Sequence, residues 1–236
     1  MRNKIFAGVM VGVLHATTAY SADAIVEPPQ QPLAAPVELY DWTGFYAGAY
    51  AGGGWGDVDF SFPTVPSAST TDVDGALVGG QIGYNYQTGN WVIGAEADMA
   101  WSGIDGSSLC PNPAFNCNAD IDWLATVRGR VGFASNNFLI YATGGLSVAD
   151  VDYVATSVAT GVPFGPTISD TATGYNVGGG AEWGFYQNWS AKIEYLYHDF
   201  GDTNLTAASF GSAGTADLDM HTVKFGLNYR FNFLNP

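Results

Sequence analysis

One run of residues constrains the fold of this chain more than any other feature. Residues 121–133 read I-D-W-L-A-T-V-R-G-R-V-G-F. Side chains along a β-strand point alternately to opposite faces, so a strand here places Arg128 and Arg130 together on one face. The other face is uncharged and carries the aromatic residues Trp123 and Phe133. This division predicts a strand with a polar lumen on one side and lipid on the other.

The same division recurs in later segments. With the parity of each segment chosen to separate the two kinds of residue, every Lys and Arg after the N-terminal signal falls on a polar face. This placement is favourable because a Lys or Arg facing lipid at the midplane of a bilayer costs about 2–4 kcal/mol. The sequence therefore predicts a network of charges in the lumen, formed by Glu96, Asp98, Arg128, Arg130, Glu182, Lys192, Glu194, Lys224 and Arg230.

Counting residues from the turns gives the expected neighbours of these charges. Glu182 comes opposite about Lys192, Glu194 opposite about Lys224, and Glu96 near Arg128. Opposite charges at cross-strand positions attract, so a salt-bridged lumen is expected. The interior of an eight-stranded barrel is just wide enough for side chains to fill, which argues against a wide pore.

Turns and loops alternate regularly along the chain. Short turn sequences occur near residues 87–90, 135–137 and 186–188, and long stretches rich in Gly, Ser, Thr, Asp and Pro lie at about 57–73, 103–120, 152–172 and 201–217. An even strand number with short turns at one end and long loops at the other is typical of outer-membrane barrels. The prediction is an all-β fold, an eight-stranded antiparallel up-and-down transmembrane β-barrel, with strands at 43–56, 74–87, 90–102, 121–134, 138–151, 173–186, 189–200 and 218–231.

A soluble eight-stranded barrel of the lipocalin kind is the main alternative. Its polar face would meet water and should be rich in Lys and Glu, whereas here that face is mostly Gly, Asn, Ser and Thr. The apolar face also ends in aromatic residues at both rims, as two membrane interfaces require. These are Trp101, Trp123 and Tyr175 near the long loops, and Trp91, Phe133, Phe185 and Tyr229 near the turns.

The N-terminus indicates export. Arg2 and Lys4 precede an apolar run and then small residues, which is the order found in a secretory signal. Cleavage is expected after Ser21, or alternatively after Ala24. The predicted organisation is a signal peptide at 1–21, a Pro-rich periplasmic linker at 22–41 and an outer-membrane barrel at 42–236.

Composition narrows the possible functions. Charged residues make up 12% of the chain, and the net charge is −15. Nucleic-acid binding needs a basic surface and is therefore not expected. A disordered acidic chain is not expected either, because 14% of the residues are aromatic.

The two cysteines, Cys110 and Cys117, bracket the short segment P-N-P-A-F-N. A disulfide is the default state of a close cysteine pair in an exported protein. Closing so short a loop contributes about 2.5 kcal/mol on the chain-entropy estimate. No further ligands lie nearby, so no metal site is expected, and no cofactor.

The candidate functions fall into four classes. The first is a non-enzymatic surface barrel, whose acidic loops either are simply solvated or hold divalent cations that bridge lipopolysaccharide phosphates. The second is a narrow pore of low conductance, and the third is haemin capture through His198 and His221. Strict alternation turns His198 to the lumen and His221 outward, which keeps them from sharing one iron. An enzyme is the fourth, and no catalytic residues are expected because no positioned Ser–His–Asp set is found.

Several segments together resemble a known family. They are A-D-A-I-V-E-P-P at 22–29, W-T-G-F-Y-A-G at 42–48, G-G-Q-I-G-Y-N-Y-Q at 79–87, L-A-T-V-R-G-R-V-G-F-A at 124–134, Y-A-T-G-G-L at 141–146, N-W-S-A-K-I-E-Y-L-Y-H-D-F-G at 188–201 and G-L-N-Y-R-F at 226–231. This series resembles the small outer-membrane immunogenic, porin-like barrels of alphaproteobacteria, which are similar in fold to the OmpA-type transmembrane barrel.

The resemblance implies an abundant surface protein in the cell outer membrane that supports envelope integrity and meets host factors, some relatives being haemin-binding. It also implies that the barrel-assembly machinery reads the last strand, with Tyr229, Phe231 and Phe233 as the expected signal. This chain departs from the usual ending, because N-F-L-N-P follows Phe231.

Overall fold

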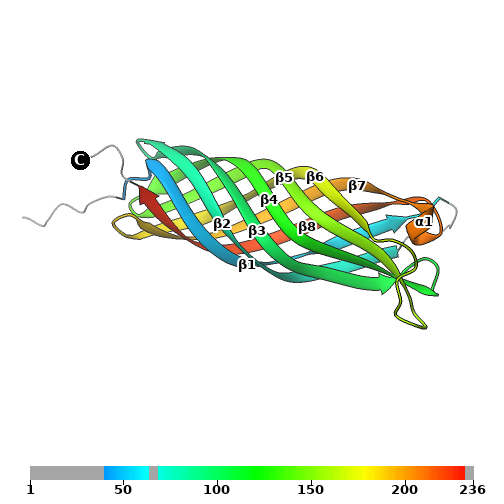
Figure 1. The fold of residues 1–236 in the computed structure, drawn as a ribbon. Coiled ribbons are helices and arrows are strands. Elements are labelled where there is room, and N and C mark those ends of the chain that lie inside the picture. The colour runs from blue at the N-terminus through cyan, green and yellow to red at the C-terminus, as the bar shows by residue number, and fades with distance from the viewer. Residues whose placement is uncertain (1–39, 64–68, 232–236) are drawn as a thin grey trace, which may run out of the picture. The chain divides into compact units, whose positions relative to one another are not determined.

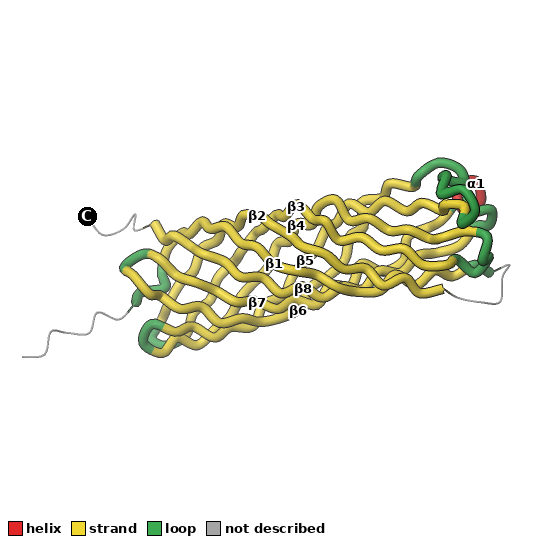
Figure 2. Tube along the Cα trace, turned by 90° about the horizontal axis from the view of Figure 1, so that it is seen from below, coloured by secondary structure: helices red, strands yellow, loops and turns green. Residues whose placement is uncertain are grey.

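The fold is a closed β-barrel. The computed structural model describes residues 40–63 and 69–231 (Figure 1), so the predicted signal peptide and most of the predicted linker lie outside the described residues. Each strand pairs antiparallel with the next and the eighth pairs with the first (Figure 2). In the described part of the chain the elements are β1 (Gly44–Ser61), β2 (Ser69–Thr88), β3 (Trp91–Leu109), β4 (Phe115–Ser135), β5 (Phe138–Ser157), β6 (Ile168–Tyr186), β7 (Trp189–Leu205), α1 (Ala207–Phe210) and β8 (Gly214–Phe231).

The predicted fold class and the three predicted short turns are confirmed. Two residues connect β2 to β3, β4 to β5 and β6 to β7. Each of these turns contains a residue with positive φ, namely Gly89 (59°), Asn136 (53°) and Gln187 (21°). Two-residue hairpin turns need positive φ to match the twist of the strands, which explains the Gly and Asn in these turns. We call this end of the barrel the turn end, and the opposite end the loop end.

The predicted strand ends at the loop end are wrong, because the strands continue through most of the sequence expected to form long loops. β1 extends to Ser61 and β3 to Leu109, where loops were expected from 57 and 103. What remains between strands at the loop end is residues 62–68, 110–114, 158–167 and 206–213.

An inversion of the polar pattern explains this difference. Toward the turn end of β1, apolar residues such as Phe45 point outward. Beyond Trp55, Asp57 and Asp59 point outward, while Val58 and Phe60 are fully buried in the interior. Beyond this point side chains still alternate between the two faces, but the polar residues now face outward and the apolar residues inward, as in a soluble barrel. The outward Asp, Ser and Thr make these strand segments resemble loop sequence.

Aromatic residues form two girdles on the outer surface. In β1 the girdle residues Phe45 and Trp55 are separated by ten residue steps. At about 3.3 Å per residue and a strand tilt of about 40°, this separation spans about 25 Å, the height of the apolar band of an outer-membrane barrel. The turn-end girdle includes Phe45, Trp91, Phe133, Phe138, Trp183 and Phe231, and the loop-end girdle includes Trp55, Trp101 and Tyr175, all of them exposed.

The interior of the barrel is filled at three levels. At the turn end, Tyr40 and Trp42 pack with Leu139 and Tyr141 as an aromatic plug. The middle holds buried charges, described below. At the loop end an apolar core, including Phe60, Val73, Ile104, Ile121, Val151, Tyr153, Leu218 and Met220, fills the tube. Among the described residues, no helix has the length and apolarity needed to cross a membrane.

Candidate functional site

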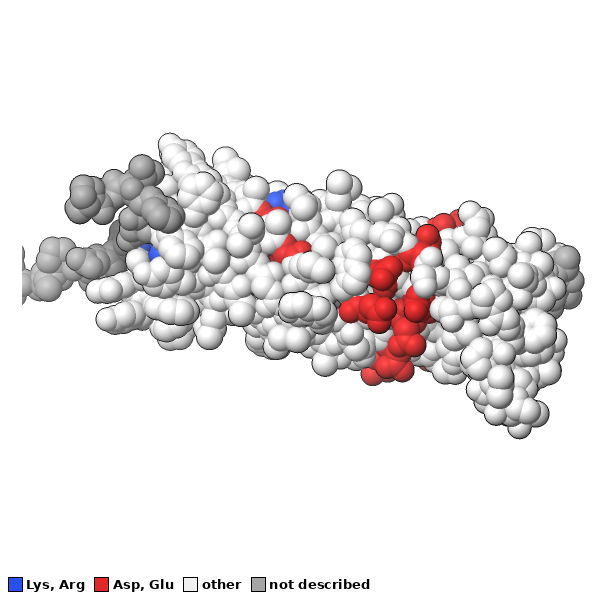
Figure 3. Space-filling view, in the orientation of Figure 1, with Lys and Arg blue, Asp and Glu red and all other residues white. Residues whose placement is uncertain are grey.

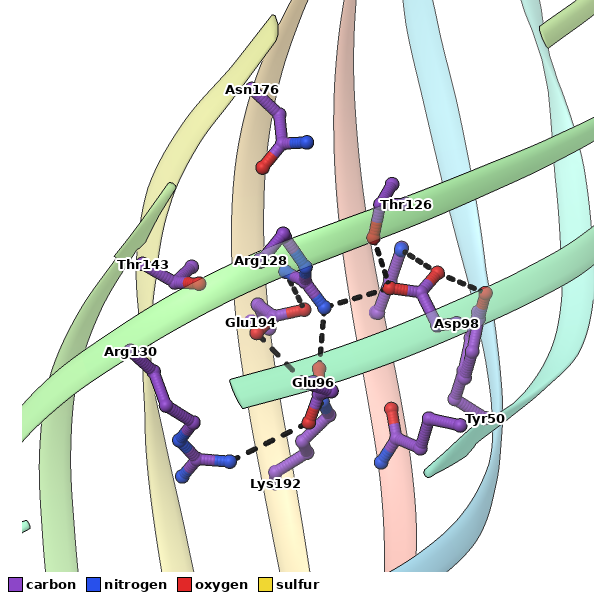
Figure 4. A network of polar contacts seen from close by, with 12 residues as sticks. Tyr50, Glu96, Asp98, Thr126, Arg128, Arg130, Thr143, Asn176, Lys192 and Glu194 are labelled. Carbon is purple, nitrogen blue, oxygen red and sulfur yellow. Dashed lines mark hydrogen bonds and ion pairs between the residues drawn. The ribbon is translucent and has the colours of Figure 1, made fainter. Parts of the chain in front are cut away.

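Glu96 lies at the centre of the charge network in the lumen (Figure 4). Its carboxylate accepts hydrogen bonds from Arg128 and from Lys192, whose Nζ lies 2.9 Å from Oε1. Arg130 lies on its other side, with Nη1 3.5 Å from Oε2, and the Tyr46 hydroxyl donates to the same oxygen at 2.7 Å. Four strands, β1, β3, β4 and β7, therefore meet at one carboxylate.

Asp98, two residues further along β3, is bound in the same way. Arg128 donates to Oδ2 and Lys224 donates to Oδ1, both at 2.8 Å. The hydroxyl of Tyr50 donates to Oδ1 at 2.7 Å, and the hydroxyl of Thr126 also donates to this carboxylate. Asp98 thus links β3 to β1, β4 and β8.

Two further carboxylates complete the network. Glu194 accepts from Arg128 at 2.8 Å and lies 3.7 Å from Lys192. Glu182 accepts from Arg130 at 2.8 Å. Four acidic and four basic side chains therefore occupy the lumen, none of them more than 5% exposed: Glu96, Asp98, Glu182, Glu194, Arg128, Arg130, Lys192 and Lys224.

These ion pairs neutralise the buried charges of the lumen network, which are out of contact with water. An unpaired buried charge costs several kcal/mol, whereas a paired and hydrogen-bonded one is tolerated. Glycines make room for the large polar side chains, since a Cβ at Gly83 would clash with the ring of Tyr46. The middle of the barrel is therefore packed with neutralised charge.

The ion pairs cross the lumen as well as joining neighbouring strands. Glu182 lies opposite Lys192 in the strand register but binds Arg130. Lys224 lies opposite Glu194 but binds Asp98. Strand register fixes only neighbours on adjacent strands, so counting from turns identifies the residues that face the lumen but not their partners across it.

Arg230 lies apart from the network. Its guanidinium sits at the turn end, 3.8 Å from the carboxylate of Asp41 and over the ring of Tyr40 at 4.7 Å. It also donates to the carbonyl oxygen of Thr43. Arg230 thus holds the segment that enters the barrel at β1 and has no ion pair with the eight central residues.

A polar cluster missed by the sequence analysis surrounds His198. The Oγ of Ser147 lies 2.8 Å from Nδ1 of His198 and also accepts a hydrogen bond from Asn176. Ser147 and His198 are both fully buried, between the charge network and the apolar core. A serine beside a histidine is the basis of nucleophilic catalysis, but here both are sealed from substrate. The one sequence signal for this cluster is the position of Ser147 in its strand, which places its side chain on the lumen face.

The second candidate histidine, His221, faces outward, as strict alternation predicts. Nδ1 of His221 lies 2.8 Å from the Tyr195 hydroxyl, and the imidazole stacks on Trp55 with ring centroids 5.8 Å apart. His198 and His221 therefore lie on opposite faces of the barrel wall and do not share a ligand position.

An aspartate belt lies on the outer surface just beyond the loop-end girdle, and Figure 3 shows the part of it on one face of the barrel. Aspartates lie directly opposite one another at six of the eight strand boundaries, as in Asp57↔Asp72 and Asp105↔Asp120. Like charges at cross-strand positions repel. The outward-facing members of the belt are Asp57, Asp59, Asp72, Asp74, Asp105, Asp120, Asp122, Asp150, Asp152, Asp199, Asp202, Asp217 and Asp219.

Repulsion and partial burial raise the pKa of several belt residues. A hydrogen bond with Asp72, and then burial, raise the pKa of Asp57. Burial and the neighbouring Asp105 raise the pKa of Asp120. Burial and the neighbouring Asp202 do the same for the pKa of Asp217.

Other predicted positions lie at the two ends of the barrel. Cys110 and Cys117 are joined by a disulfide where β3 passes into β4. Tyr229 and Phe231 end β8 on the outer surface, while Phe233 lies outside the described residues. Among the residues that the structure describes, no group of three or more His, Cys, Asp or Glu could hold a metal ion.

An apolar outer wall between two aromatic girdles, closed around a charged lumen, defines a transmembrane barrel of the outer membrane. The family model for the outer membrane protein beta-barrel domain matches residues 31–231. The chain belongs to this family, and its place is the outer membrane.

Similar proteins agree with this assignment. The 31 kDa outer-membrane immunogenic protein of Brucella melitensis is 36% identical over 98% of this chain and 100% of its own length. The 22 kDa outer membrane protein of Rhizobium leguminosarum is 33% identical over 80% of this chain and 78% of its own. The crystal structure of OprG from Pseudomonas aeruginosa covers 82% of this chain and 98% of that one, with 14% identity and a TM-score of 0.52, a likeness of fold.

Proposed function

We propose that this protein is a non-enzymatic surface protein that supports the integrity of the outer membrane and contacts host or other surface factors. The observation that carries the proposal is the filled lumen. An aromatic plug, a neutralised charge network and an apolar core occupy the tube in series, which leaves the outer wall and the loop end as the surfaces that can act.

Lipopolysaccharide is the lipid partner that we propose. The aspartate belt lies beyond the loop-end aromatic girdle, at the height of lipid head groups, where phosphates would repel it. Divalent cations prefer oxygen ligands such as carboxylates and can be shared between the belt and those phosphates. The described residues contain no preformed metal cluster, so such cations would bridge two partners rather than occupy a site within the barrel.

Contact with the outside is supported by the relatives. Those from Brucella are named outer-membrane immunogenic proteins, which fits a loop end accessible to a host. We extend this accessibility to the present chain as part of the proposal. No nucleic-acid partner is proposed, because the outer surface is acidic.

The barrel-assembly machinery is a further proposed partner. Tyr229 and Phe231 lie on the outer face at the end of β8, and their rings contact each other with centroids 5.2 Å apart. We propose that these aromatics, with Phe233, form the signal that the machinery reads.

Three other functions have less support. A narrow pore, of low conductance at most, conflicts with the three filled levels of the lumen. Haemin capture by both histidines conflicts with their positions on opposite faces of the wall. Catalysis by Ser147 and His198 conflicts with their complete burial.

The proposal is tested in a deletion strain complemented with three forms of the protein. The forms are wild type, a belt variant (D57N, D72N, D105N and D120N together) and the control D41N, whose change lies at the turn end. Deletion should increase sensitivity to detergent and to a chelator of divalent cations, and wild type and D41N should restore resistance.

The belt variant separates the two parts of the proposal. It should fold, as judged by heat-modifiable gel mobility, and fail to restore resistance to the chelator. A deletion strain with unchanged sensitivity would contradict the envelope role, and full rescue by the belt variant would contradict the cation bridge.

A further inference from the structure

A hollow of about 560 Å³ opens on the lipid-facing surface of β1 to β4, near the turn end. Its floor is formed by small residues, Ala47 of β1 and Ala97 of β3. Large residues rise beside them: Phe45 next to Ala47 on β1, Ile82 between the two alanines, and Val127 beyond Ala97. These residues are 58%, 64% and 65% exposed. The hollow therefore combines a recessed floor with raised sides.

The strand register explains why the surface is recessed here. Ala47 pairs with Ile82, Ile82 with Ala97, and Ala97 with Val127, so small and large outward residues alternate across four strands. Phe45 packs on Tyr84 with ring centroids 4.7 Å apart, which holds one wall upright. The alternation of residue size thus builds a fixed hollow.

The chemistry of the hollow selects an apolar occupant. The floor and the raised residues carry hydrocarbon side chains, and Tyr84 adds a hydroxyl at the border of the hollow. Tyr46 and Glu96 lie beside it in the sequence, but their side chains point into the lumen and hydrogen-bond to each other. The hollow lies within the apolar band, so the medium that reaches it is the hydrocarbon of the membrane.

We propose that this hollow binds one acyl chain of a phospholipid in the half of the bilayer next to the turn end. In a membrane, association depends on close packing, because lipid tails are as apolar as the protein surface. A thin, flexible chain can lie over Ala97 and touch the raised side chains of Ile82 and Val127 on its two sides. The convex wall of a second barrel would meet only the raised side chains. Tyr84 suits the adjacent head group, since tyrosines concentrate at membrane interfaces.

Filling the hollow tests the proposal. Ala97→Phe places a ring in the hollow, while the control Ala142→Phe adds the same ring to an exposed, lipid-facing position of β5 outside it. Both variants keep the apolar outer face, and heat-modifiable gel mobility checks that they fold. Each full-length protein is incorporated into vesicles of phosphatidylethanolamine and phosphatidylglycerol, extracted in mild detergent and weighed by native mass spectrometry.

Wild type and A142F should retain one phospholipid per barrel, and A97F should retain about tenfold less, equivalent to about 1.4 kcal/mol of lost packing. Equal retention by A97F and wild type would overturn the proposal, as would a wild type that retains no lipid. A dimer that A97F converts to a monomer would also overturn it, by showing that a second copy occupies the hollow.

Discussion

At the scale of single residues, Arg128 forms more ion pairs than any other basic side chain of the lumen network. Its guanidinium binds Glu96, Asp98 and Glu194 at once. Arg128→Met keeps much of the volume but leaves three buried carboxylates short of a partner. Breaking a buried pair from one side costs about 3–5 kcal/mol, so the free energy of unfolding in detergent micelles should fall by that amount, as measured by urea titration of the heat-modifiable band.

Two comparisons show whether charge is the cause. Arg230→Met removes a guanidinium whose carboxylate partner, Asp41, is largely exposed, so its loss should be clearly smaller. Adding Glu194→Gln to Arg128→Met restores the balance of charge and should recover part of the stability. Equal losses in the two arginine variants would contradict the picture of a central, charge-dependent network.

At the scale of strands, the sequence predicts the segments that lie within the membrane but not the strand segments that continue beyond it. Alternation of charge and apolar residues identified the inward faces of the membrane segments, including both arginines of β4. Beyond Trp55 the alternation reverses, so outward Asp57 and inward Val58 no longer match a lipid-facing strand. The bulge between Ile121 and Trp123 also shifts the parity of β4, which a fixed period of two cannot anticipate.

The strand segments beyond the loop-end girdle, which carry the aspartate belt, should be more stable in acid. The pKa values of Asp57, Asp120 and Asp217 are raised in the folded barrel, so the folded state binds protons more tightly than the unfolded state. Stability is therefore gained as the pH falls through these pKa values and lost again as it rises. Amide hydrogen exchange, corrected for the intrinsic effect of pH, should show stronger protection of the loop-end halves of β1, β4 and β8 at pH 4 than at pH 7.

A paired substitution isolates the belt as the cause of this pH dependence. Asp105→Asn with Asp120→Asn removes the pair that these two residues form and also the pairs that they form with Asp74 and Asp152. It should raise protection of β3 and β4 at pH 7 and reduce the difference between the two pH values, whereas Asp41→Asn at the turn end should change neither. An unchanged pH difference in the paired variant would show that repulsion between these aspartates is not responsible.

The disulfide should matter to the tip of one hairpin rather than to the barrel. Cys110 follows directly after β3 and Cys117 lies within β4, and the two strands pair as far as Leu109↔Asn116. Replacing both with Ser should lower the free energy of unfolding by about 2.5 kcal/mol at most, and the heat-modifiable band should persist. Failure of this variant to form that band would mean that the disulfide is needed for the barrel to close.

At the scale of the whole molecule, the barrel has two regions in which polar and apolar residues are arranged in opposite ways. Inside the membrane its wall is apolar and its interior polar, and beyond the membrane its wall is acidic and its interior apolar. The two interiors meet near His198, whose imidazole stacks parallel to the ring of Phe200, with centroids 6.0 Å apart. One continuous set of strands therefore spans both regions, so closure of the lumen does not depend on any single layer.

Because three successive layers fill the lumen, the barrel is expected not to conduct ions. In planar bilayers the wild-type protein should give no stable openings, because ions would have to displace paired charges and then cross a dry apolar core. Removing one layer should not change this result, so Trp42→Ala in the turn-end plug and Arg128→Met in the network should both remain closed. Large, stable openings in wild type would mean that the lumen rearranges in a membrane, and openings in Trp42→Ala alone would place the barrier in the plug instead of in three successive layers.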